Sequence, residues 1–231
     1  MEKLKIVVLG DGLLGTELST RLKSESFSRK KNNFDVLYFD EWCKNLANYN
    51  IIINCIANTN TYSNDRKLHW DVNYKFVHHL IEYCNKYEKK LIHISTDYVY
   101  SFSDENASED DVPVHNKSWY GYTKLLSDGL IQLLSNNYLI CRCTHKMNPF
   151  PYEEAWIDQI GNFDYVDEIT NLIIQLIETD AKGVYNVGTQ LKTMFELANK
   201  TKKVKKIFSP THVPKNTSMN VDKLKKQITK I

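Results

Sequence analysis

Tyr120 and Lys124 are the residues whose types and spacing most clearly suggest chemistry. They stand four positions apart, and residues at that spacing share one face of a helix. An unperturbed phenol titrates near ~10, and a neighbouring ammonium group lowers its pKa because it stabilises the phenolate. The pair therefore predicts an acid and base for proton transfer near neutral pH. Thr96, which ends a buried apolar run, would add a hydroxyl that holds the reacting oxygen.

The N-terminal segment predicts a phosphate-binding turn. A short apolar run of strand type, Lys3 to Leu9, leads into glycines at Gly10, Gly12 and Gly15, and a helical pattern follows. In such a strand, turn and helix, the backbone can approach a pyrophosphate, which rests on the N–H groups at the start of the helix. A tight turn without a ligand is the other interpretation of the same residues.

Composition limits the class of protein. With 231 residues, 42% of them hydrophobic, the chain can bury one sizeable core, or form a main domain with a small appendage. The net charge of +2 argues against a dedicated nucleic-acid binder. The lysine clusters near the C-terminus are typical of solvated surfaces.

The cysteines and the apolar segments indicate a cytoplasmic protein. Five cysteines are an odd number and have neither disulfide-framework nor zinc-ligand spacing, so we expect reduced thiols and no metal site. The N-terminal apolar run is too short for a secretory signal, and no stretch approaches the ~20 apolar residues of a membrane helix.

Short apolar runs alternate with helical patterns along the chain. This alternation predicts an α/β fold, a doubly wound parallel sheet covered by helices on both faces. The expected strands lie at 36–39, 51–56, 91–94, 138–141 and 184–187, and the expected helices at 68–87, 120–134, 166–177 and 195–200. Ligands of such sheets bind beyond the carboxyl ends of the strands, where Gly10, Ala57, Thr96 and Arg142 fall.

Several segments, in order, resemble the dTDP-4-dehydrorhamnose reductase family of extended short-chain dehydrogenases/reductases. Together they cover nearly the whole chain. They are the glycine turn and residues 53–59, 71–73, 95–100, 120–125, 139–142, 165–168 and 214–224. The resemblance implies a Rossmann-type fold and a cytoplasmic oxidoreductase of deoxysugar biosynthesis.

The implied reaction is reduction of the C4 ketone of a nucleotide-linked 4-dehydro-6-deoxy sugar by NADPH or NADH. By resemblance, Tyr120 is the proton donor, Lys124 lowers its pKa and binds the nicotinamide ribose, and Thr96 bonds the carbonyl oxygen. The remaining cofactor contacts are expected at Gly10, Gly12, Leu13, Leu14, Gly15, Asp40, Ala57 and Thr59. Substrate contacts are expected at Asn73, Tyr98, Arg142 and His145, the last standing where the family usually has a tryptophan.

Other features narrow the subclass. Relatives that dehydrate the sugar have a glutamate after the aspartate, whereas this chain has Tyr98 after Asp97. Relatives that combine reduction with epimerisation use a cysteine near the threonine that corresponds to Thr96. No cysteine lies between Cys84 and Cys141, so simple reduction is favoured. Asp40, if it ends the second strand, would bond the adenosine ribose and favour NADH; it could equally lie outside the site.

The domain prediction is a dinucleotide-binding domain at 1–145 that carries the catalytic residues, followed at 146–231 by a mixed segment that completes the sheet and forms a small, reduced substrate-binding lobe. Two alternatives stay open. One is a non-catalytic, NAD(P)-binding regulatory subunit of another enzyme, and the other is a nucleotide-sugar epimerase on the same scaffold. A homodimer is also considered.

Overall fold

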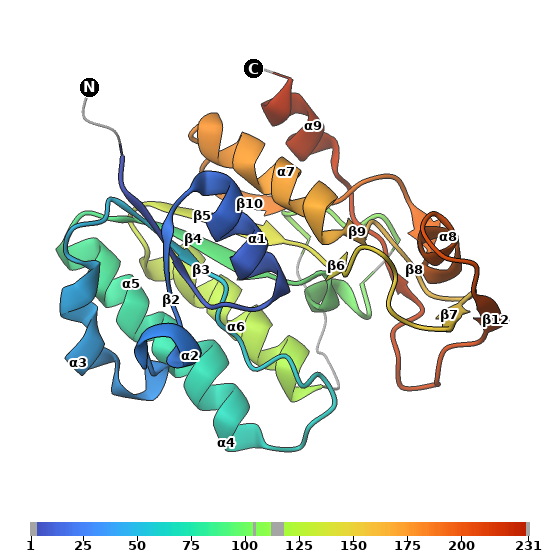
Figure 1. Ribbon diagram of the computed structural model, residues 1–231, viewed down its shortest axis with the longest axis horizontal. Coiled ribbons are helices and arrows are strands. Elements are labelled where there is room, and N and C mark those ends of the chain that lie inside the picture. The colour runs from blue at the N-terminus through green and yellow to red at the C-terminus, as the bar shows by residue number, and fades with distance from the viewer. Residues whose placement is uncertain (1–3, 104, 112–117, 230–231) are drawn as a thin grey trace. The chain divides into compact units, whose positions relative to one another are not determined.

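The structure is a computed structural model that describes residues 4–103, 105–111 and 118–229 (Figure 1). The chain forms two compact units. The first comprises residues 1–95 and 117–140, and the second comprises residues 96–116 and 141–231.

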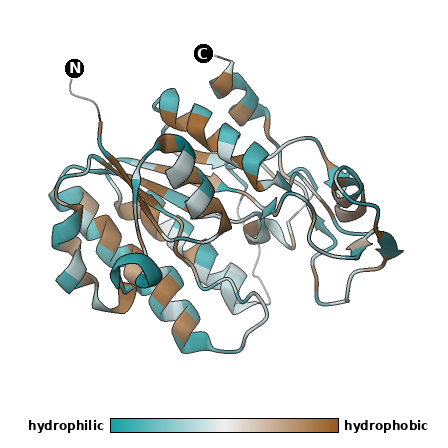
Figure 2. Cartoon of the chain, in the orientation of Figure 1, coloured by the Kyte–Doolittle hydropathy of each residue, from teal (hydrophilic) through white to brown (hydrophobic). Residues whose placement is uncertain are grey.

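The first unit is built on a sheet in which strands lie in the order β2, β1, β3, β4 and β5. Their bounds are Ile6–Leu9 (β1), Glu25–Phe27 (β2), Ile51–Asn54 (β3), Lys90–Ser95 (β4) and Tyr138–Arg142 (β5). Strand β1 pairs in parallel with β2 and β3, and β4 pairs in parallel with β3. The apolar, β-branched runs of β1 and β3 are buried, as in strands covered on both faces (Figure 2). The strands predicted near β3, β4 and β5 are confirmed.

Helices flank this sheet. They are α1 (Leu13–Leu22), α2 (Arg29–Asn32), α3 (Phe39–Trp42), α4 (Arg66–His69), a π-helical segment (Trp70–Lys75), α5 (Phe76–Lys86) and α6 (Trp119–Leu134). Helix α1 packs on β1 and β2, whereas α5 packs on β4 and against α6. The first unit is therefore a Rossmann-like α/β structure, as predicted. None of the helices in the described part of the chain has the length and apolar character needed to cross a bilayer.

The strand predicted at 36–39 is wrong. Residues Val36–Tyr38 form a 3₁₀ turn that continues into α3, because the Asp35 side chain accepts a hydrogen bond from the backbone N–H of Leu37 at 3.0 Å and starts a helical turn. The strand beside β1 is instead Glu25–Phe27. Asp40 consequently lies in α3 and not at the end of a strand.

The second unit contains the end of β5 with its neighbour β10 (Gly183–Asn186), which the sequence predicted, and three small sheets. Their strands are β6 (His145–Lys146) with β9 (Asp164–Tyr165), β7 (Glu154–Trp156) with β12 (Lys205–Ile207), and β8 (Ile160–Gly161) between β11 (Lys192–Thr193) and β13 (Asn216–Thr217). The helices are α7 (Val166–Glu178), α8 (Met194–Asn199) and α9 (Asp222–Ile228).

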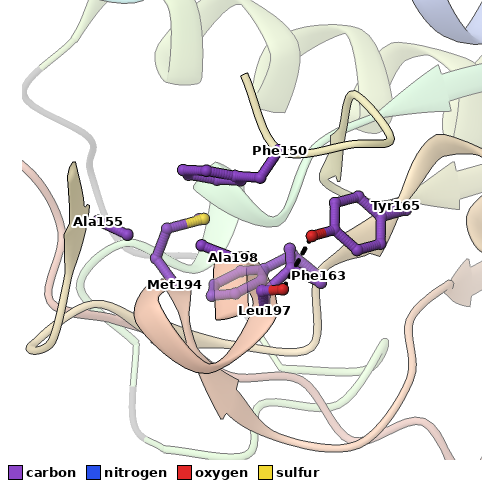
Figure 3. Close-up of a cluster of buried hydrophobic side chains, with 7 residues drawn as sticks. All are labelled: Phe150, Ala155, Phe163, Tyr165, Met194, Leu197 and Ala198. Atoms are coloured by element: carbon purple, nitrogen blue, oxygen red, sulfur yellow. Dashed lines mark hydrogen bonds between the residues drawn. The ribbon is translucent and has the colours of Figure 1, made fainter. Parts of the chain in front are cut away.

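A compact hydrophobic cluster holds the small elements of the second unit together (Figure 3). Its members are Phe150, Ala155, Phe163, Tyr165, Met194, Leu197 and Ala198. The Tyr165 hydroxyl donates to the carbonyl oxygen of Leu197 at 2.9 Å, so the one polar atom of that ring is satisfied. A capping box between Thr193 and Glu196 fixes the start of α8 beneath the cluster.

Leu80 and Leu133 provide a matched test of the core of the first unit. Both are leucines on helices, but Leu80 is 0% exposed and Leu133 is 80% exposed. We expect Leu80→Ala to lower the free energy of unfolding by roughly 2–5 kcal/mol, since it leaves a cavity. Leu133→Ala should change it by no more than about 0.5 kcal/mol. Chemical denaturation of both variants measures the difference, and equal losses would contradict this description of the core.

Candidate functional site

A cavity of about 660 Å³ lies in the first unit where β1 and β3 end. The chain leaves β1 toward β2 on one side, and β3 lies on the other, so this is the switch point at which open α/β sheets bind ligands. The predicted residues Gly10, Gly12, Ala57 and Thr59 line the cavity. Its other lining residues are Asp11, Ser28, Arg29, Lys30, Phe34, Asp35, Val36, Leu37, Cys55, Ile56, Asn58, Asn60, Leu68 and Val72.

The glycines of the turn have distinct structural roles. Gly10 has φ +104°, a conformation that side chains disfavour. A Cβ on Gly15 would overlap the carbonyl oxygen of Gly10, whereas a Cβ on Gly12 would meet nothing within 4 Å. Gly15 is therefore needed for packing, and Gly12 leaves room at the start of α1. Of the two leucines predicted here, Leu13 is exposed and Leu14 is buried.

The loop after β3 contains a hydrogen-bond donor that could bind a ligand. The side-chain nitrogen Nδ2 of Asn58 is buried and has no hydrogen-bond partner among the described residues. The loop itself is held by Asn73, whose side chain accepts from the Asn58 N–H at 2.7 Å and donates to the Asn58 carbonyl at 3.2 Å. Asn73 is buried and braces this loop, a role that the sequence did not indicate.

Asp40 does not line this cavity. The acidic residues that line it are Asp11 and Asp35, and the basic residues Arg29 and Lys30 come just after β2 and Ser28. The expectation of an acidic strand end rested on the misassigned strand at 36–39, so the prediction for Asp40 loses its structural basis.

Tyr120 and Lys124 lie one turn apart on α6, as predicted. The Ser118 side chain accepts from the Gly121 N–H at 3.1 Å and fixes the start of the helix just before Tyr120. Lys124 is buried, with its Nζ 2.8 Å from both Nε2 of His93 and the carbonyl oxygen of Ile94.

His93 is a site residue that sequence reasoning missed. It lies on β4 and is buried between Lys124 and Asn54, whose Nδ2 is 3.1 Å from its Nδ1. Burial, together with the nearby Lys124, lowers the pKa of His93 well below its usual value. The signal in the sequence was a single ionisable residue within the apolar run of a strand. Burial also raises the pKa of the adjacent Cys55 thiol to about 12, so this thiol stays protonated.

Thr96 belongs to the second unit, where it begins the turn after β4. Its hydroxyl oxygen accepts from the Tyr98 N–H at 3.2 Å. The next residue, Asp97, is buried and accepts hydrogen bonds from Thr144 and Thr217. Burial raises the pKa of Asp97, although these hydroxyl bonds oppose the rise.

The predicted substrate residues of the second unit are mostly enclosed. Arg142 is buried, with its guanidinium over the ring of Tyr100 and hydrogen-bonded to the Tyr100 hydroxyl. Burial lowers the pKa of His145 to about 4, and its Nδ1 has no partner in the described part of the chain. Tyr98 is half-buried.

Lys146 borders a cavity of about 540 Å³ in the second unit. The other lining residues are largely apolar or aromatic: Phe150, Tyr152, Glu153, Glu154, Ala155, Trp156, Met194 and Ile207. Burial lowers the pKa of Lys146, while the charge of Asp97 opposes that shift. The cavity thus combines flat apolar surfaces with one cation.

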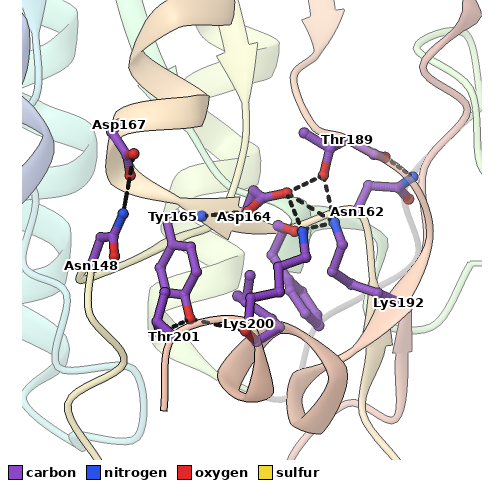
Figure 4. A network of polar contacts seen from close by, with 11 residues as sticks. Asn148, Asn162, Asp164, Tyr165, Asp167, Thr189, Lys192, Lys200 and Thr201 are labelled. Carbon is purple, nitrogen blue, oxygen red and sulfur yellow. Dashed lines mark hydrogen bonds and ion pairs between the residues drawn. The ribbon is translucent and has the colours of Figure 1, made fainter.

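A second cavity of the same unit, about 800 Å³, is lined by a polar network (Figure 4). Asp164 accepts hydrogen bonds from Thr189 at 2.6 Å and Lys192 at 3.0 Å, and Lys200 lies 3.5 Å away. Burial alone would raise the pKa of Asp164, but hydrogen bonds from Thr189, the Tyr165 N–H and Lys192 outweigh it and lower that pKa. The carboxylate is satisfied from within the protein, so this network is a structural support.

Comparison with known proteins places these features in context. The model of the family described as "RmlD substrate binding domain" matches residues 4–146. Among solved structures, a dTDP-4-dehydrorhamnose reductase from Bacillus anthracis in complex with NADP has a TM-score of 0.82 at 24% identity, over 96% of this chain and 92% of that chain. No curated protein matched the sequence.

Two further structures share the fold. A hypothetical dTDP-4-dehydrorhamnose reductase from Sulfolobus tokodaii has a TM-score of 0.80 at 21% identity, covering 96% of this chain and 94% of that one. A UDP-glucuronic acid 4-epimerase from Bacillus cereus in complex with NAD has a TM-score of 0.73 at 19% identity, covering 98% and 90%. At these identities the likeness establishes the fold.

Gly15 and Gly129 allow a test of the turn geometry. Gly15→Ala should destabilise the protein by roughly 1–3 kcal/mol, because the new methyl group overlaps the Gly10 carbonyl. Gly129 lies in α6, and a Cβ added there would meet nothing within 4 Å, so Gly129→Ala should stabilise the protein by about 0.5–1 kcal/mol. Thermal and denaturant unfolding measure both. A Gly15→Ala variant as stable as the unmodified protein would contradict the close approach.

Proposed function

Because the chain belongs to the family of the RmlD substrate binding domain, we propose that it is an NAD(P)H-dependent oxidoreductase of the short-chain dehydrogenase/reductase type. Its substrate would be a nucleotide-linked 4-dehydro-6-deoxy sugar, reduced at the C4 ketone in deoxysugar biosynthesis. The observation that carries the proposal is the placement of Tyr120 and Lys124 on one turn of α6, in the unit that also holds the glycine-turn cavity.

The cavity of the first unit fits a nicotinamide dinucleotide. The space beside Gly12 and the N–H groups at the start of α1 suit a pyrophosphate, and the unpartnered Nδ2 of Asn58 suits an acceptor on the ligand. Arg29 and Lys30 follow β2, where a 2′-phosphate would lie in this fold. We therefore propose NADPH as the preferred cofactor, a preference consistent with the NADP bound to the Bacillus anthracis reductase.

When bound, the reduced nicotinamide supplies the hydride that reaches the carbonyl carbon. Tyr120 gives the proton to the ketone oxygen, so that alkoxide charge does not accumulate unpaired. Thr96 stays the residue that the sequence predicts as a hydrogen-bond donor to this oxygen. Lys124 holds the tyrosine oxygen and the nicotinamide ribose in position.

The cavity beside Lys146 suits the nucleotide of the substrate. Trp156 and Tyr152 offer flat apolar surfaces for a base, and the Lys146 ammonium offers a counter-charge for a diphosphate. In this proposal residues 1–145 bind the dinucleotide, and residues 146–231 form a small substrate-binding lobe. Tyr98, Arg142 and His145, which precede that lobe in the chain, remain predicted substrate contacts.

A cytoplasmic location is part of the proposal. The five cysteines are all free, as expected in a reducing compartment. A homodimer stays a prediction.

The proposal is tested by mixing the protein with NADPH or NADH and freshly generated dTDP- or UDP-linked 4-dehydro-6-deoxy sugars, and following loss of the reduced nicotinamide. Oxidation that depends on the sugar supports the reductase. Saturable nucleotide binding without oxidation would favour a regulatory subunit, and interconversion of epimers without net consumption would favour an epimerase.

Tyr120→Phe tests the proton donor. Removal of the hydroxyl should lower kcat by roughly 10²–10⁴-fold, the usual contribution of general acid catalysis, and leave the Kd for NADPH unchanged. Tyr122→Phe, two residues along the same helix, is the matched control and should retain full turnover. A fully active Tyr120→Phe variant would assign the proton transfer to another group.

Arg29→Ala tests the cofactor preference. Loss of a charged contact to a 2′-phosphate, worth about 1.5–3 kcal/mol, should weaken NADPH binding by roughly 10–100-fold and leave NADH binding nearly unchanged. Arg21→Ala is the control, because Arg21 pairs with Glu17 on α1 and does not line the cavity. Equal effects of Arg29→Ala on both cofactors would argue against a 2′-phosphate site here.

A further inference from the structure

Asp11 places a negative charge inside the glycine turn. It stands between Gly10 and Gly12, is half-buried, and lines the cavity of the first unit. Its backbone carbonyl oxygen accepts a hydrogen bond from the Thr16 hydroxyl at 3.1 Å. Its carboxylate, by contrast, takes part in no hydrogen bond or ion pair with the described residues. The charge is therefore left to act on whatever enters the cavity.

The backbone of the turn holds this carboxylate close to the start of α1. Before Asp11, the Gly10 N–H donates to the carbonyl oxygen of Phe27 at 2.8 Å. After it, the Thr16 N–H donates to the Gly12 carbonyl oxygen at 2.9 Å. Because an aspartate side chain is short, its charge stays in the same part of the cavity in each of its rotamers.

Turn chemistry does not require the charge. Asparagine suits a tight turn as well as aspartate does, because both side chains are short and can hydrogen-bond to the nearby backbone. The carboxylate does lie near the positive end of the α1 dipole, which favours a negative charge. That end is also where the proposed pyrophosphate would lie. Asp11 and the cofactor would consequently share one source of positive potential.

The two negative charges of a dinucleotide pyrophosphate are repelled by the Asp11 carboxylate. Water screens this repulsion less than it would on an open surface, because Asp11 is half-buried. No side chain caps α1 at Gly12, so the N–H groups there stay accessible to the ligand despite the nearby charge. We propose that Asp11 is an affinity-lowering residue of the cofactor cavity, which keeps the dinucleotide exchangeable. This inference rests on the proposed function.

An exchangeable cofactor suits a reductase. Ketone reduction consumes the hydride, so the oxidised nicotinamide has to leave and a reduced one has to enter in each turnover. An epimerase returns the hydride to the sugar and can keep its nicotinamide bound. The Asp11 carboxylate weakens the binding of both redox forms, because both carry the same pyrophosphate. Among the alternatives, the charge in the turn therefore favours the reductase over the epimerase.

Asp11→Asn removes the charge and keeps the size and the turn chemistry of the side chain. We expect it to tighten the binding of both NADPH and NADH by roughly 3–10-fold at low ionic strength. The gain should shrink to less than about twofold at ~0.5 M salt, since salt screens the repulsion. Titrations that follow the fluorescence of the reduced nicotinamide give the Kd values. An unchanged or weakened affinity at low ionic strength would overturn the proposal.

Asp40→Asn is the matched control. Asp40 is exposed on α3 and does not line the cavity, so its substitution changes the net charge equally and should leave both Kd values unchanged. A second probe is 2′-AMP, which has the 2′-phosphate and no pyrophosphate. Its affinity should change by less than about twofold in Asp11→Asn. An equal gain in Asp40→Asn, or for 2′-AMP, would refute a local action of Asp11 on the pyrophosphate.

Release of the cofactor is measured by displacing bound NADPH in a stopped-flow instrument. The dissociation rate should fall in Asp11→Asn by roughly the factor gained in affinity. Tighter binding with an unchanged dissociation rate would refute the link between Asp11 and exchange.

These measurements require no sugar, so they separate the two proposals. Tighter binding and slower release in Asp11→Asn, in a protein that lacks reductase activity, would uphold the role of Asp11 and refute the function. An active reductase whose NADPH affinity does not respond to Asp11→Asn would uphold the function and refute the role of Asp11. If neither protein bound NADPH or NADH saturably, both proposals would be wrong.

Discussion

The burial of the Lys124 amine constrains much of the first unit. A polar nitrogen removed from water costs free energy unless it finds partners, and this nitrogen finds them in the His93 ring and the Ile94 carbonyl. Both partners belong to β4, so these two contacts fix the position of α6 along that strand. The pairing of Asn54 with His93 extends the same constraint to β3. The helix that carries Tyr120 is thus positioned by the sheet, with a precision that a surface loop would not provide.

A second constraint acts at the neighbouring strand ends. Gly15 lets α1 approach the Gly10 carbonyl, and Gly10 in turn packs against Cys55 and Ile56 beyond β3. A side chain at Gly15 would push the helix away from the sheet, and one at Gly10 would press on the segment that follows β3. Because the strands are parallel, the cavity at these ends and the buried polar side chains of β3, β4 and α6 lie in one compact unit. The geometry needed for cofactor binding and proton transfer therefore depends on the same strand pairings.

The sequence predicted the elements whose patterns are strong over many residues. The long helix that begins before Tyr120 and the apolar strands β3, β4 and β5 were found near their observed positions. Strand β2 was missed because Glu25–Phe27 is short and has one large apolar residue. The apolar run at 36–39 was mistaken for that strand, since the cap formed by the Asp35 side chain depends on its rotamer, which no periodicity reveals.

The candidate site was predictable to the extent that it depends on local spacing. Tyr120 and Lys124 share a helix face, and the glycine turn follows a strand, whatever the rest of the chain does. His93 is different, because a histidine in an apolar run acquires a partner only through strand register. A slip of one residue in the pairing of β3 and β4 would turn it to the opposite face of the sheet. Chemistry that depends on register thus becomes visible only once the fold is known.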